Sequence, residues 1–381
     1  MIKRQLQDLR QYVEPNKVLL IQGPRQVGKT TLVKNYLSTL PNEYNYIYLT
    51  GDSIEAKEVF SSQSINKITG FAQGKQLIVV DEAQKIDNIG LGLKILVDNV
   101  ERIKVIATGS SSFQIRQRVG EPLVGRAKRL RLYPVAISEL IDSGLNEYQV
   151  DQKLHEYLTY GLYPDVLSSK GDHQKRAKLE ELVDQYLLMD VLEFDRVKGS
   201  KFILDLLCLL AFQIGQLVSV NELANKLGVN ARTVSRYLDL LEQSYILINI
   251  RGYRRNLRAE INKKSKYYFY DVGIRNAIIG NYNSPDLRND IGGLWENFLV
   301  VERLKRQAYE PIYSNNYFWR TWEKHEVDWV EEHDGKLYGS EIKWGKSSKK
   351  QPKFTETYAE AKLETINKKN YLKWITIKPH G

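Results

Sequence analysis

The strongest constraint on the fold is a strand, a glycine-containing loop and a helix that follow one another near the amino terminus. Residues 17–22 (KVLLIQ) form a short apolar run, typical of a strand buried in a parallel sheet. The chain then reads GPRQVGKTT over residues 23–31 and continues into the helical pattern LVKNYL. This is the spacing GxxxxGK[ST] between a strand and a helix, the context that a phosphate-binding loop requires. We therefore predict a P-loop here.

Each residue type in this loop suits a bound polyphosphate. Gly23 and Gly28 let the backbone wrap around a phosphate without Cβ clashes, and the free N–H groups at the start of the following helix point at the anion. Lys29 can reach the β and γ phosphates, and the Thr30 hydroxyl can coordinate Mg²⁺.

Two further apolar runs end in residues that complete such a site. The run QLIVV (76–80) leads into Asp81 and Glu82, with room before it for a helix and a strand at 46–50. Asp81 is placed to bind Mg²⁺ through water or through Thr30, and Glu82 to polarise the attacking water. A third strand, at 105–107, ends in Thr108-Gly109-Ser110, where a hydroxyl or amide can sense the γ-phosphate. The predicted nucleotide-contacting set is Gly23, Pro24, Arg25, Gln26, Val27, Gly28, Lys29, Thr30, Thr31, Asp81 and Ser110. The alternative is a structural glycine turn.

Phosphoryl transfer also needs a cation beyond Lys29 to stabilise charge in the transition state. Arg126, after Gly125, is our candidate for an arginine finger, and Arg25 inside the loop is a second. The alternative for any one of these cations is that it belongs to a solvated basic loop and has no catalytic role. The cations between residues 116 and 131 are Arg116, Arg118, Arg126, Lys128, Arg129 and Arg131.

The composition limits the class of protein. With 381 residues, 42% of them hydrophobic, the chain is expected to be globular with two or three domains. The single cysteine, Cys208, excludes an internal disulfide framework and is expected to be a buried thiol. The start MIKRQLQDLR lacks the apolar stretch of a secretory signal, and no run approaches the length of a membrane span. We expect a cytoplasmic protein with no membrane partner. Its net charge of +10 suggests a polyanionic one.

The middle of the chain reads as helices followed by a helix-turn-helix. Residues 138–215 have a helical, Leu- and Glu-rich pattern, with one amphipathic helix expected at 179–192, and are interpreted as a lid or linker. Ser219 and Glu222 have capping-box spacing before ELANKL, and a longer helix is expected at 231–242. The residues expected to meet DNA bases near the start of that second helix are Arg232, Thr233, Ser235 and Arg236.

A basic hairpin is expected after this helix. An alternating strand at 245–250 and the run YYFY (267–270) flank a turn rich in cations. Arg254 and Arg255, with the interleaved Tyr253, suit phosphate contacts on the wing of a winged helix. The alternative is a structural or protein-binding module. The cations of this segment are Arg251, Arg254, Arg255, Arg258, Lys263, Lys264 and Lys266.

The last hundred residues predict the order α-β-β-β-α-β, the minimal core of a restriction-endonuclease-like fold. The expected elements are a helix at 292–307, strands at 317–322, 326–330 and 336–343, a helix at 356–367 and a strand at 371–377. The sequence HDG (333–335) is a hairpin turn signal. A further group of lysines, expected to flank a cleavage site, comprises Lys343, Lys346, Lys349, Lys350 and Lys353.

Acidic residues fall where metal-dependent phosphodiester cleavage needs them. Asp328 lies in one hairpin strand, while Glu341 and Lys343 lie two apart in its partner and project from one face. Asp328 and Glu341, with Glu296 from the helix, could hold Mg²⁺ or Mn²⁺. Lys343 would orient or deprotonate the attacking water. The alternative is a salt-bridged sheet face in a nuclease-like fold that only binds.

These motifs resemble two prokaryotic families. GPRQVGKTT (23–31), VVDEAQ (79–84), TGSS (108–111) and YPVAISEL (133–140) look like the AAA-like P-loop ATPases called AAA_14. YFYDVGI (268–274), GGLWENFLVVERL (292–304), EVDWV (326–330) and EIKWG (341–345) resemble DUF4143, the domain of unknown function that accompanies AAA_14.

The resemblance implies ATP rather than GTP, a winged helix in the middle and a PD-(D/E)XK-like tail. It carries Lys29, Thr30, Asp81 and Glu82 over as ATP-site residues, and Glu296, Asp328, Glu341 and Lys343 as the nuclease set. Glu326 competes with Asp328 for the first acid of that set.

We therefore expect an α/β protein with four parts: a P-loop ATPase core (1–137), a helical lid (138–215), a winged helix-turn-helix (216–284) and a nuclease-like domain (285–381). The leading hypothesis is a Mg²⁺-dependent ATPase that binds DNA and cleaves it. The competing one is a nucleotide-dependent switch with a non-catalytic tail. A finger arginine supplied in trans would require a homo-oligomer.

Overall fold

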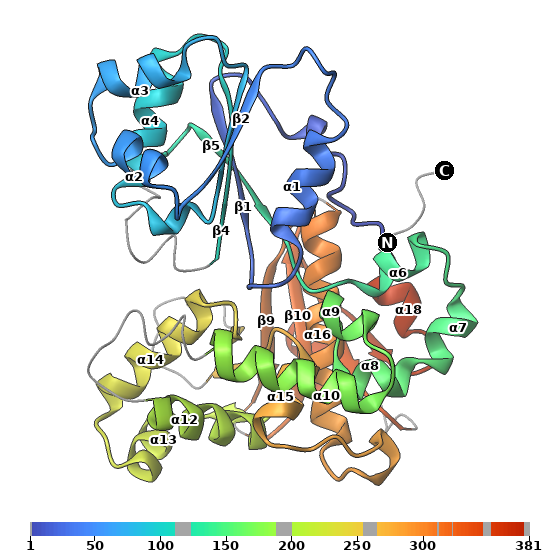
Figure 1. The fold of residues 1–381 in the computed structure, drawn as a ribbon. Coiled ribbons are helices and arrows are strands. Elements are labelled where there is room, and N and C mark those ends of the chain that lie inside the picture. The colour runs from blue at the N-terminus through green and yellow to red at the C-terminus, as the bar shows by residue number, and fades with distance from the viewer. Residues whose placement is uncertain are drawn as a thin grey trace. The chain divides into compact units, whose positions relative to one another are not determined.

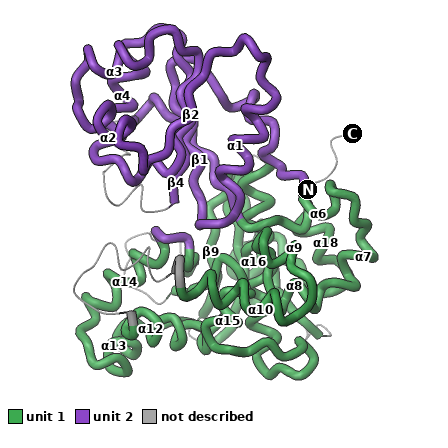
Figure 2. Tube along the Cα trace, viewed as in Figure 1, with its two compact units in different colours: residues 1–2, 134–242, 246–381 green, residues 3–133, 243–245 purple. Residues whose placement is uncertain are grey.

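The computed structural model describes residues 2–110, 123–187, 200–253, 265–310, 312–321, 323–345 and 352–376. The chain divides into two compact units (Figures 1 and 2). Unit 2 holds residues 3–133 and 243–245, and unit 1 holds residues 1–2, 134–242 and 246–381. Ten cations named above lie outside the described residues: Arg116, Arg118, Arg254, Arg255, Arg258, Lys263, Lys264, Lys346, Lys349 and Lys350.

Unit 2 is a parallel sheet with helices on both faces. Its described strands are hydrogen-bonded in the order β2-β3-β4-β1-β5, and every neighbouring pair is parallel. Helix α1 covers one face, and α2, α3 and α4 cover the other (Figure 1). The elements are η1 (Leu9–Gln11), β1 (Lys17–Gln22), α1 (Lys29–Leu37), β2 (Tyr46–Thr50), α2 (Ile54–Phe60), α3 (Ile65–Ala72), β3 (Leu77–Asp81), η2 (Ala83–Lys85), α4 (Ile89–Asn99), β4 (Lys104–Gly109) and β5 (Ala127–Arg131).

Strands β1 and β3 are apolar on both faces because both faces of the sheet are covered there. In β1 every residue after Lys17 is buried, and all five residues of β3 are buried. Alternate residues such as Val18, Leu20 and Ile78 pack with α2–α4 in one core. The predicted α/β fold with a parallel sheet is confirmed.

Unit 1 contains a mixed sheet surrounded by helices. Its helical elements are α6 (Ile137–Asp142), α7 (Glu147–Gln152), α8 (Leu154–Tyr160), α9 (Pro164–Ser168), α10 (Asp172–Glu181), the π-helical η3 (Leu182–Leu187), α12 (Ser200–Phe212), α13 (Val220–Leu227), α14 (Ala231–Gln243), α15 (Val272–Ile278), η5 (Pro285–Leu287), α16 (Ile291–Tyr309), α17 (Pro352–Thr357) and α18 (Tyr371–Ile375). Its strands are β6 (Leu217–Val218), β7 (Leu247–Gly252), β8 (Ser265–Phe269), β9 (Asn315–Arg320), β10 (Glu326–His333), β11 (Lys336–Ile342) and β12 (Lys362–Ile366).

One sheet spans the segments predicted to form separate winged-helix and nuclease-like domains. The strand order among described residues is β12-β11-β10-β9-β7-β8-β6. Strand β7 pairs in parallel with β9, which joins the β7–β8 hairpin to the strands after residue 285. The predicted turn between β10 and β11 is confirmed, because Asp334 and Gly335 both have positive φ and His333 pairs with Lys336.

The last two predicted elements are wrong. Residues 362–366 form strand β12, which pairs in parallel with β11, although their composition favours a helix. Residues 371–375 form helix α18, not a strand. Its buried residues Tyr371, Leu372, Trp374 and Ile375 follow helical spacing and join the core that contains α16. The helix expected at 179–192 begins earlier, as α10, and continues into η3.

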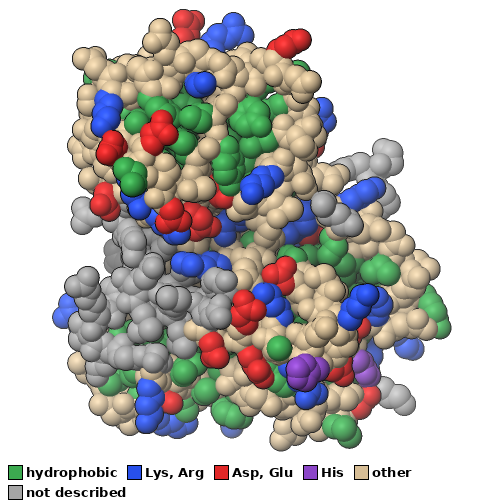
Figure 3. Space-filling model, in the orientation of Figure 1, with side chains coloured by type: hydrophobic (Ala, Val, Ile, Leu, Met, Phe, Trp, Pro, Cys, Tyr) green, Lys and Arg blue, Asp and Glu red, His purple; other side chains and the backbone are tan. Residues whose placement is uncertain are grey.

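No helix in the described segments is long and apolar enough to cross a membrane. On the face shown in Figure 3, basic and acidic side chains are interspersed over the described surface.

A buried carboxylate ties two segments of unit 1 together. Asp271 begins α15 and accepts hydrogen bonds from the N–H groups of Gly273 (2.8 Å), Ile274 (3.3 Å) and Leu162 (2.7 Å). Gly161 ends α8 with φ of 72°, and a Cβ there would lie 1.8 Å from Asp271 Oδ1. Only glycine allows this approach.

We predict that Gly161→Ala lowers the free energy of unfolding of unit 1 by about 2 kcal/mol more than Gly171→Ala does, because only the first substitution adds a steric overlap. Gly171 is the matched control, since its φ is 78° and a Cβ there meets nothing within 4 Å. Denaturation followed by tryptophan fluorescence reports on unit 1, because all six tryptophans lie within residues 246–381. Equal losses in the two variants would contradict the argument.

Candidate nucleotide site

The predicted phosphate loop connects β1 to α1 in unit 2. A Cβ at Gly23 would lie 2.0 Å from the Leu132 carbonyl oxygen, so this position accepts only glycine. Gly28 precedes α1 with φ of 96°. The Lys29 side chain is buried, and its ammonium donates to the carbonyls of Gly23 (2.9 Å) and Pro24 (2.7 Å). The lysine therefore lies within the loop that it is expected to serve.

The other predicted loop residues take different positions. Pro24 and Val27 are buried, Arg25 and Gln26 are half-buried, and Thr31 is exposed on α1. Gln26 has φ of 57°, in the left-handed region.

Arg4, which sequence reasoning missed, holds this loop from the amino-terminal segment. Its guanidinium donates to the carbonyl of Val27 (2.6 Å) and to that of Tyr133 (2.6 Å). These bonds join the loop to the segment that follows β5, so Arg4 is a positioning residue for the phosphate loop.

Asp81, at the end of β3, accepts three hydroxyl hydrogen bonds. Thr30 Oγ1 and Tyr48 OH donate to Oδ2, at 2.8 and 2.5 Å, and Thr108 Oγ1 donates to Oδ1. Burial, and then the bond to Asp81, raise the pKa of the Tyr48 phenol, so it keeps its proton. The three donors come from α1, β2 and β4 and fix the orientation of the carboxylate.

This arrangement fits a bound Mg²⁺ in its donor chemistry. The ion prefers hard oxygen ligands, and the Thr30 hydroxyl and the Asp81 carboxylate are such groups, in direct contact with each other. They would hold the ion beside the phosphate loop.

A second chain of hydrogen bonds positions Glu82. Its backbone N–H donates to Thr108 Oγ1 (3.1 Å), and its carboxylate accepts from the Gln84 amide. The same amide nitrogen donates to Ser110 Oγ (3.2 Å). Gln84 and Ser110 are both buried, so the tip of β4 and the predicted water-activating carboxylate are linked through one side chain.

Arg126 does not lie near this site. It precedes β5, whose first residue pairs with Val18 at the start of β1, whereas the phosphate loop follows the end of β1. Its guanidinium instead pairs with Asp98 (2.5 Å). This placement corrects the expectation of a finger within the same chain. Arg131 is the better candidate, because β5 places it beside Gln22, the residue before the loop.

The carboxylates expected to bind metal in unit 1 surround a lysine. The Lys266 ammonium lies 2.9 Å from Glu296 Oε1, 2.6 Å from Glu326 Oε1 and 3.6 Å from Asp328 Oδ1. The Lys266 side chain is only 1% exposed, so this member of the basic segment does not present its charge on the surface. Tyr268 adds a hydroxyl bond to Glu296 Oε1 at 2.6 Å.

The other members of the predicted nuclease set are also engaged or buried. Asp328 Oδ2 accepts from the Ile342 N–H (2.9 Å) and from Lys343 Nζ (3.4 Å). Glu341 is buried in β11. Over the part of the chain that the structure describes, no group of three His, Cys, Asp or Glu side chains could hold a metal ion. The expected convergence of Glu296, Asp328 and Glu341 on a metal is therefore corrected.

The predicted helix-turn-helix residues lie at the start of α14. Arg232, Ser235 and Arg236 are exposed, while the Thr233 N–H and hydroxyl donate to Asn230 Oδ1 at 2.7 and 2.9 Å. The opposite face of the helix is buried and contains Val234, Leu238 and Leu241.

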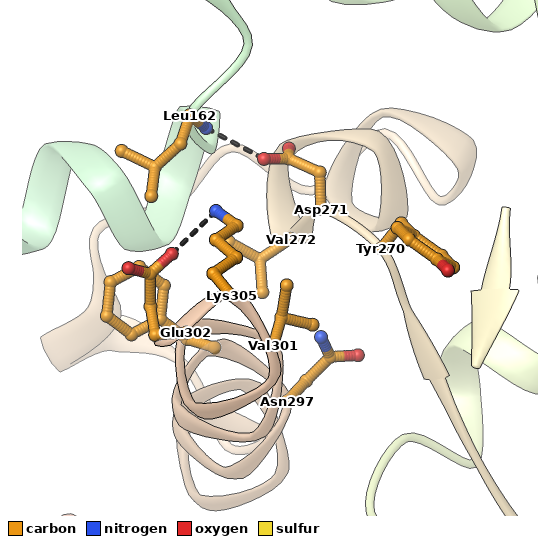
Figure 4. A pocket seen from close by; sticks show the side chains of 9 residues that line it. Leu162, Tyr270, Asp271, Val272, Asn297, Val301, Glu302 and Lys305 are labelled. Carbon is orange, nitrogen blue, oxygen red and sulfur yellow. Dashed lines mark hydrogen bonds and ion pairs between the residues drawn. The ribbon is translucent and has the colours of Figure 1, made fainter. Parts of the chain in front are cut away.

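Unit 1 also contains a small pocket between α15, α16 and the segment after α8 (Figure 4). Its charged groups satisfy one another or the backbone. Lys305 Nζ contacts Glu302 (2.6 Å) and the Val135 carbonyl (2.8 Å), and Asp271 accepts from the Leu162 N–H. We assign this pocket a structural role.

Comparison with known families identifies both ends of the chain. Residues 15–141 match the family model of the AAA domain AAA_14, and residues 291–374 match that of DUF4143, a domain of unknown function. The predicted pairing of AAA_14 with DUF4143 is confirmed. Residues 151–284 match another domain of unknown function, DUF8612.

Similar proteins are found in bacteria and archaea. An uncharacterized protein of Haemophilus influenzae is 26% identical over 328 residues, 80% of this chain and 79% of the relative. One of Mycobacterium tuberculosis is 26% identical over 338 residues, 88% of this chain and 72% of the relative. An uncharacterized protein of Methanocaldococcus jannaschii is 22% identical over 333 residues, 83% of this chain and 72% of the relative.

Two solved structures also align with the chain. A DNA polymerase III gamma subunit-related protein from Thermotoga maritima has a TM-score of 0.25 at 14% identity, covering 62% of this chain and 95% of that one. Cdc6p from Pyrobaculum aerophilum has a TM-score of 0.29 at 12% identity, covering 69% of this chain and 86% of that one. Scores this low carry no argument about function.

We predict that Tyr48→Phe weakens Mg²⁺-dependent nucleotide binding by about 3- to 10-fold, because it removes one hydrogen bond to Asp81 without opening a cavity. Titration of a fluorescent ATP analogue with and without Mg²⁺ measures the effect. Tyr46→Phe is the matched control on the same strand, since Tyr46 is 40% exposed. A Tyr48→Phe protein that binds as tightly as wild type would show that this hydroxyl has no positioning role.

Proposed function

We propose that the chain is a Mg²⁺-dependent ATPase that binds and hydrolyses ATP in unit 2 and contacts DNA through the helix-turn-helix of unit 1, without cleaving it. The observation that carries the ATPase proposal is the contact between Thr30 and Asp81 beside a buried Lys29. It brings the two groups that would hold Mg²⁺ together near the phosphate-binding lysine, at the edge of the sheet where the strands end.

The residues divide the work as follows. The loop N–H groups and Lys29 bind the β and γ phosphates, and Lys29 then exchanges its hydrogen bonds with the Gly23 and Pro24 carbonyls for phosphate oxygens. Thr30 and Asp81 would hold Mg²⁺, which when bound offsets phosphate charge. Glu82 accepts the proton of the attacking water, and Ser110 senses the γ-phosphate from the tip of β4.

Gln84 supports a coupling between these last two roles. Its amide contacts both the Glu82 carboxylate and the Ser110 hydroxyl. A shift of Ser110 toward a bound phosphate therefore also moves the Gln84 amide, which donates to the Glu82 carboxylate.

DNA contact is supported by the exposure of Arg232, Ser235 and Arg236 on one end of α14. Arginine at the start of a recognition helix reaches base edges and phosphates. Cleavage receives no such support, because the Lys266 ammonium already contacts Glu296 and Glu326, two of the carboxylates that were candidates to bind a metal.

We predict that Lys29→Ala removes detectable ATP binding, and that Glu82→Gln retains ATP binding but lowers kcat by about 100-fold or more, since general-base catalysis contributes about 10²–10⁴. Phosphate release under saturating Mg²⁺-ATP measures kcat. Glu58→Gln is the matched control, because Glu58 is exposed on α2. Unchanged turnover in Glu82→Gln would reject the assignment of the base, and wild type that binds ATP without hydrolysing it would reject the ATPase.

For DNA, we predict that the double variant Arg232→Ala, Arg236→Ala binds duplex DNA more weakly and reduces the slope of log affinity against log salt by about 2, because each phosphate contact contributes about 0.9. The charge-matched control is Lys153→Ala, Lys170→Ala, which removes two exposed lysines of unit 1 outside the helix-turn-helix. Fluorescence anisotropy at several salt concentrations measures both quantities. Equal losses in the two double variants would indicate non-specific charge attraction instead.

A further inference from the structure

Lys266 is a deeply buried lysine of unit 1 whose ammonium is surrounded by several carboxylates. It lies on β8, and its ammonium contacts Glu296 from α16 together with Glu326 and Asp328 from β10. The exposed fractions of the Glu296, Asp328 and Lys266 residues are 8%, 7% and 1%. An ammonium has three N–H donors, so it can serve three carboxylates from one position.

The same carboxylates are supplied with further donors. Tyr268 OH donates to Glu296 Oε1, Arg320 Nη1 lies 3.0 Å from Glu326 Oε2, and Lys343 Nζ lies 3.4 Å from Asp328 Oδ2. The acidic cluster is thus compensated by groups of this chain itself.

The neighbouring negative charges keep Lys266 ionised in spite of its burial. Burial by itself lowers the pKa of the Lys266 ammonium, but the charges of Glu296, Tyr268, Asp328 and Glu326 outweigh it and raise this pKa well above its usual value. A buried charged group is stable only while its oppositely charged partners are present, so the members of this cluster depend on one another.

We infer that Lys266 is the resident cation of this cluster: its ammonium lies among the carboxylates that a divalent metal would need, and unit 1 folds without such a metal. A metal ion would need the oxygens of Glu296 and Asp328 that already face the ammonium. The two cations therefore exclude each other, and removing the ammonium frees these oxygens to close around a divalent cation. This inference does not rest on the proposed ATPase.

The test uses the full chain without nucleotide, with Asp81→Asn present in every protein so that the phosphate-loop site does not bind metal. Melting is followed by tryptophan fluorescence, which reports on unit 1 alone because all six tryptophans belong to it. Each protein is melted in EDTA and in millimolar Mn²⁺.

With Lys266 present, the melting temperature should be the same in EDTA and in Mn²⁺. Lys266→Met should melt about 10 °C lower in EDTA, because it leaves buried carboxylates without their counter-charge. Mn²⁺ should restore most of this loss. Lys343→Met is the control, since Lys343 contacts Asp328 but has a side chain 37% exposed, and it should show neither the loss nor the rescue.

Two results would overturn the inference. One is an increase in melting temperature by Mn²⁺ with Lys266 present that Asp328→Asn abolishes, because the cluster would then bind metal beside the lysine. The other is a folded Lys266→Met protein that Mn²⁺ does not stabilise. If Lys266→Met does not fold in EDTA, the double variant Lys266→Met, Glu296→Gln replaces it, because it also removes one of the opposing charges. The double variant should fold in EDTA. Mn²⁺ should raise its melting temperature less than it raises that of Lys266→Met purified in Mn²⁺.

Discussion

Unit 2 depends on the geometry of a parallel sheet, in which all strands end at the same edge. The carboxyl ends of β1, β3 and β4 bring the phosphate loop, Asp81 with Glu82, and Thr108 with Ser110 to that edge. The hydroxyls of Thr30, Tyr48 and Thr108 then converge on one carboxylate. A candidate nucleotide site results from residues that are far apart in the chain, because the strands run in the same direction. For the same reason Arg126 lies away from the site, because it is next to the amino-terminal end of β1, opposite the phosphate loop.

Buried ion pairs hold together the described part of unit 1. Lys266 with its carboxylates, Lys305 with Glu302, and Arg303 with Glu331 are ion pairs in which both side chains are largely buried. Lys266 on β8 and Glu331 on β10 pair with residues of α16, and because buried pairs are costly to break, these two favour one packing of α16 against the sheet. Glu296, Glu302 and Arg303 all belong to α16. These charged side chains face the interior, whereas those of a surface helix face the solvent. A nuclease-like pattern of acids can arise from this structural use of charge.

Local patterns in the chain predicted most elements of both units. Strand β1, the loop and α1 follow from an apolar run, two glycines and a helical repeat, all within 21 residues of sequence (17–37). The β10–β11 hairpin follows from Asp334-Gly335, which tolerates the positive φ that its turn requires. The errors came at the carboxyl end, where 362–366 has a helix-favouring composition but gains a parallel partner in β11. Pairing with a distant strand outweighs local propensity there.

What the sequence by itself determined is the chemistry available: a phosphate loop with Lys29 and Thr30, an Asp-Glu pair after a strand, and a helix-turn-helix with exposed arginines. These are local because each depends on residues a few positions apart. Only the tertiary structure decided which charges meet. Lys266 sits 30 residues before Glu296 and 60 before Glu326, and nothing in its neighbours distinguishes a lysine on a basic wing from one inside an acidic cluster. Contact between charges depends on how strands and helices pack, and this packing turned an expected metal site into one filled by a side chain of the protein.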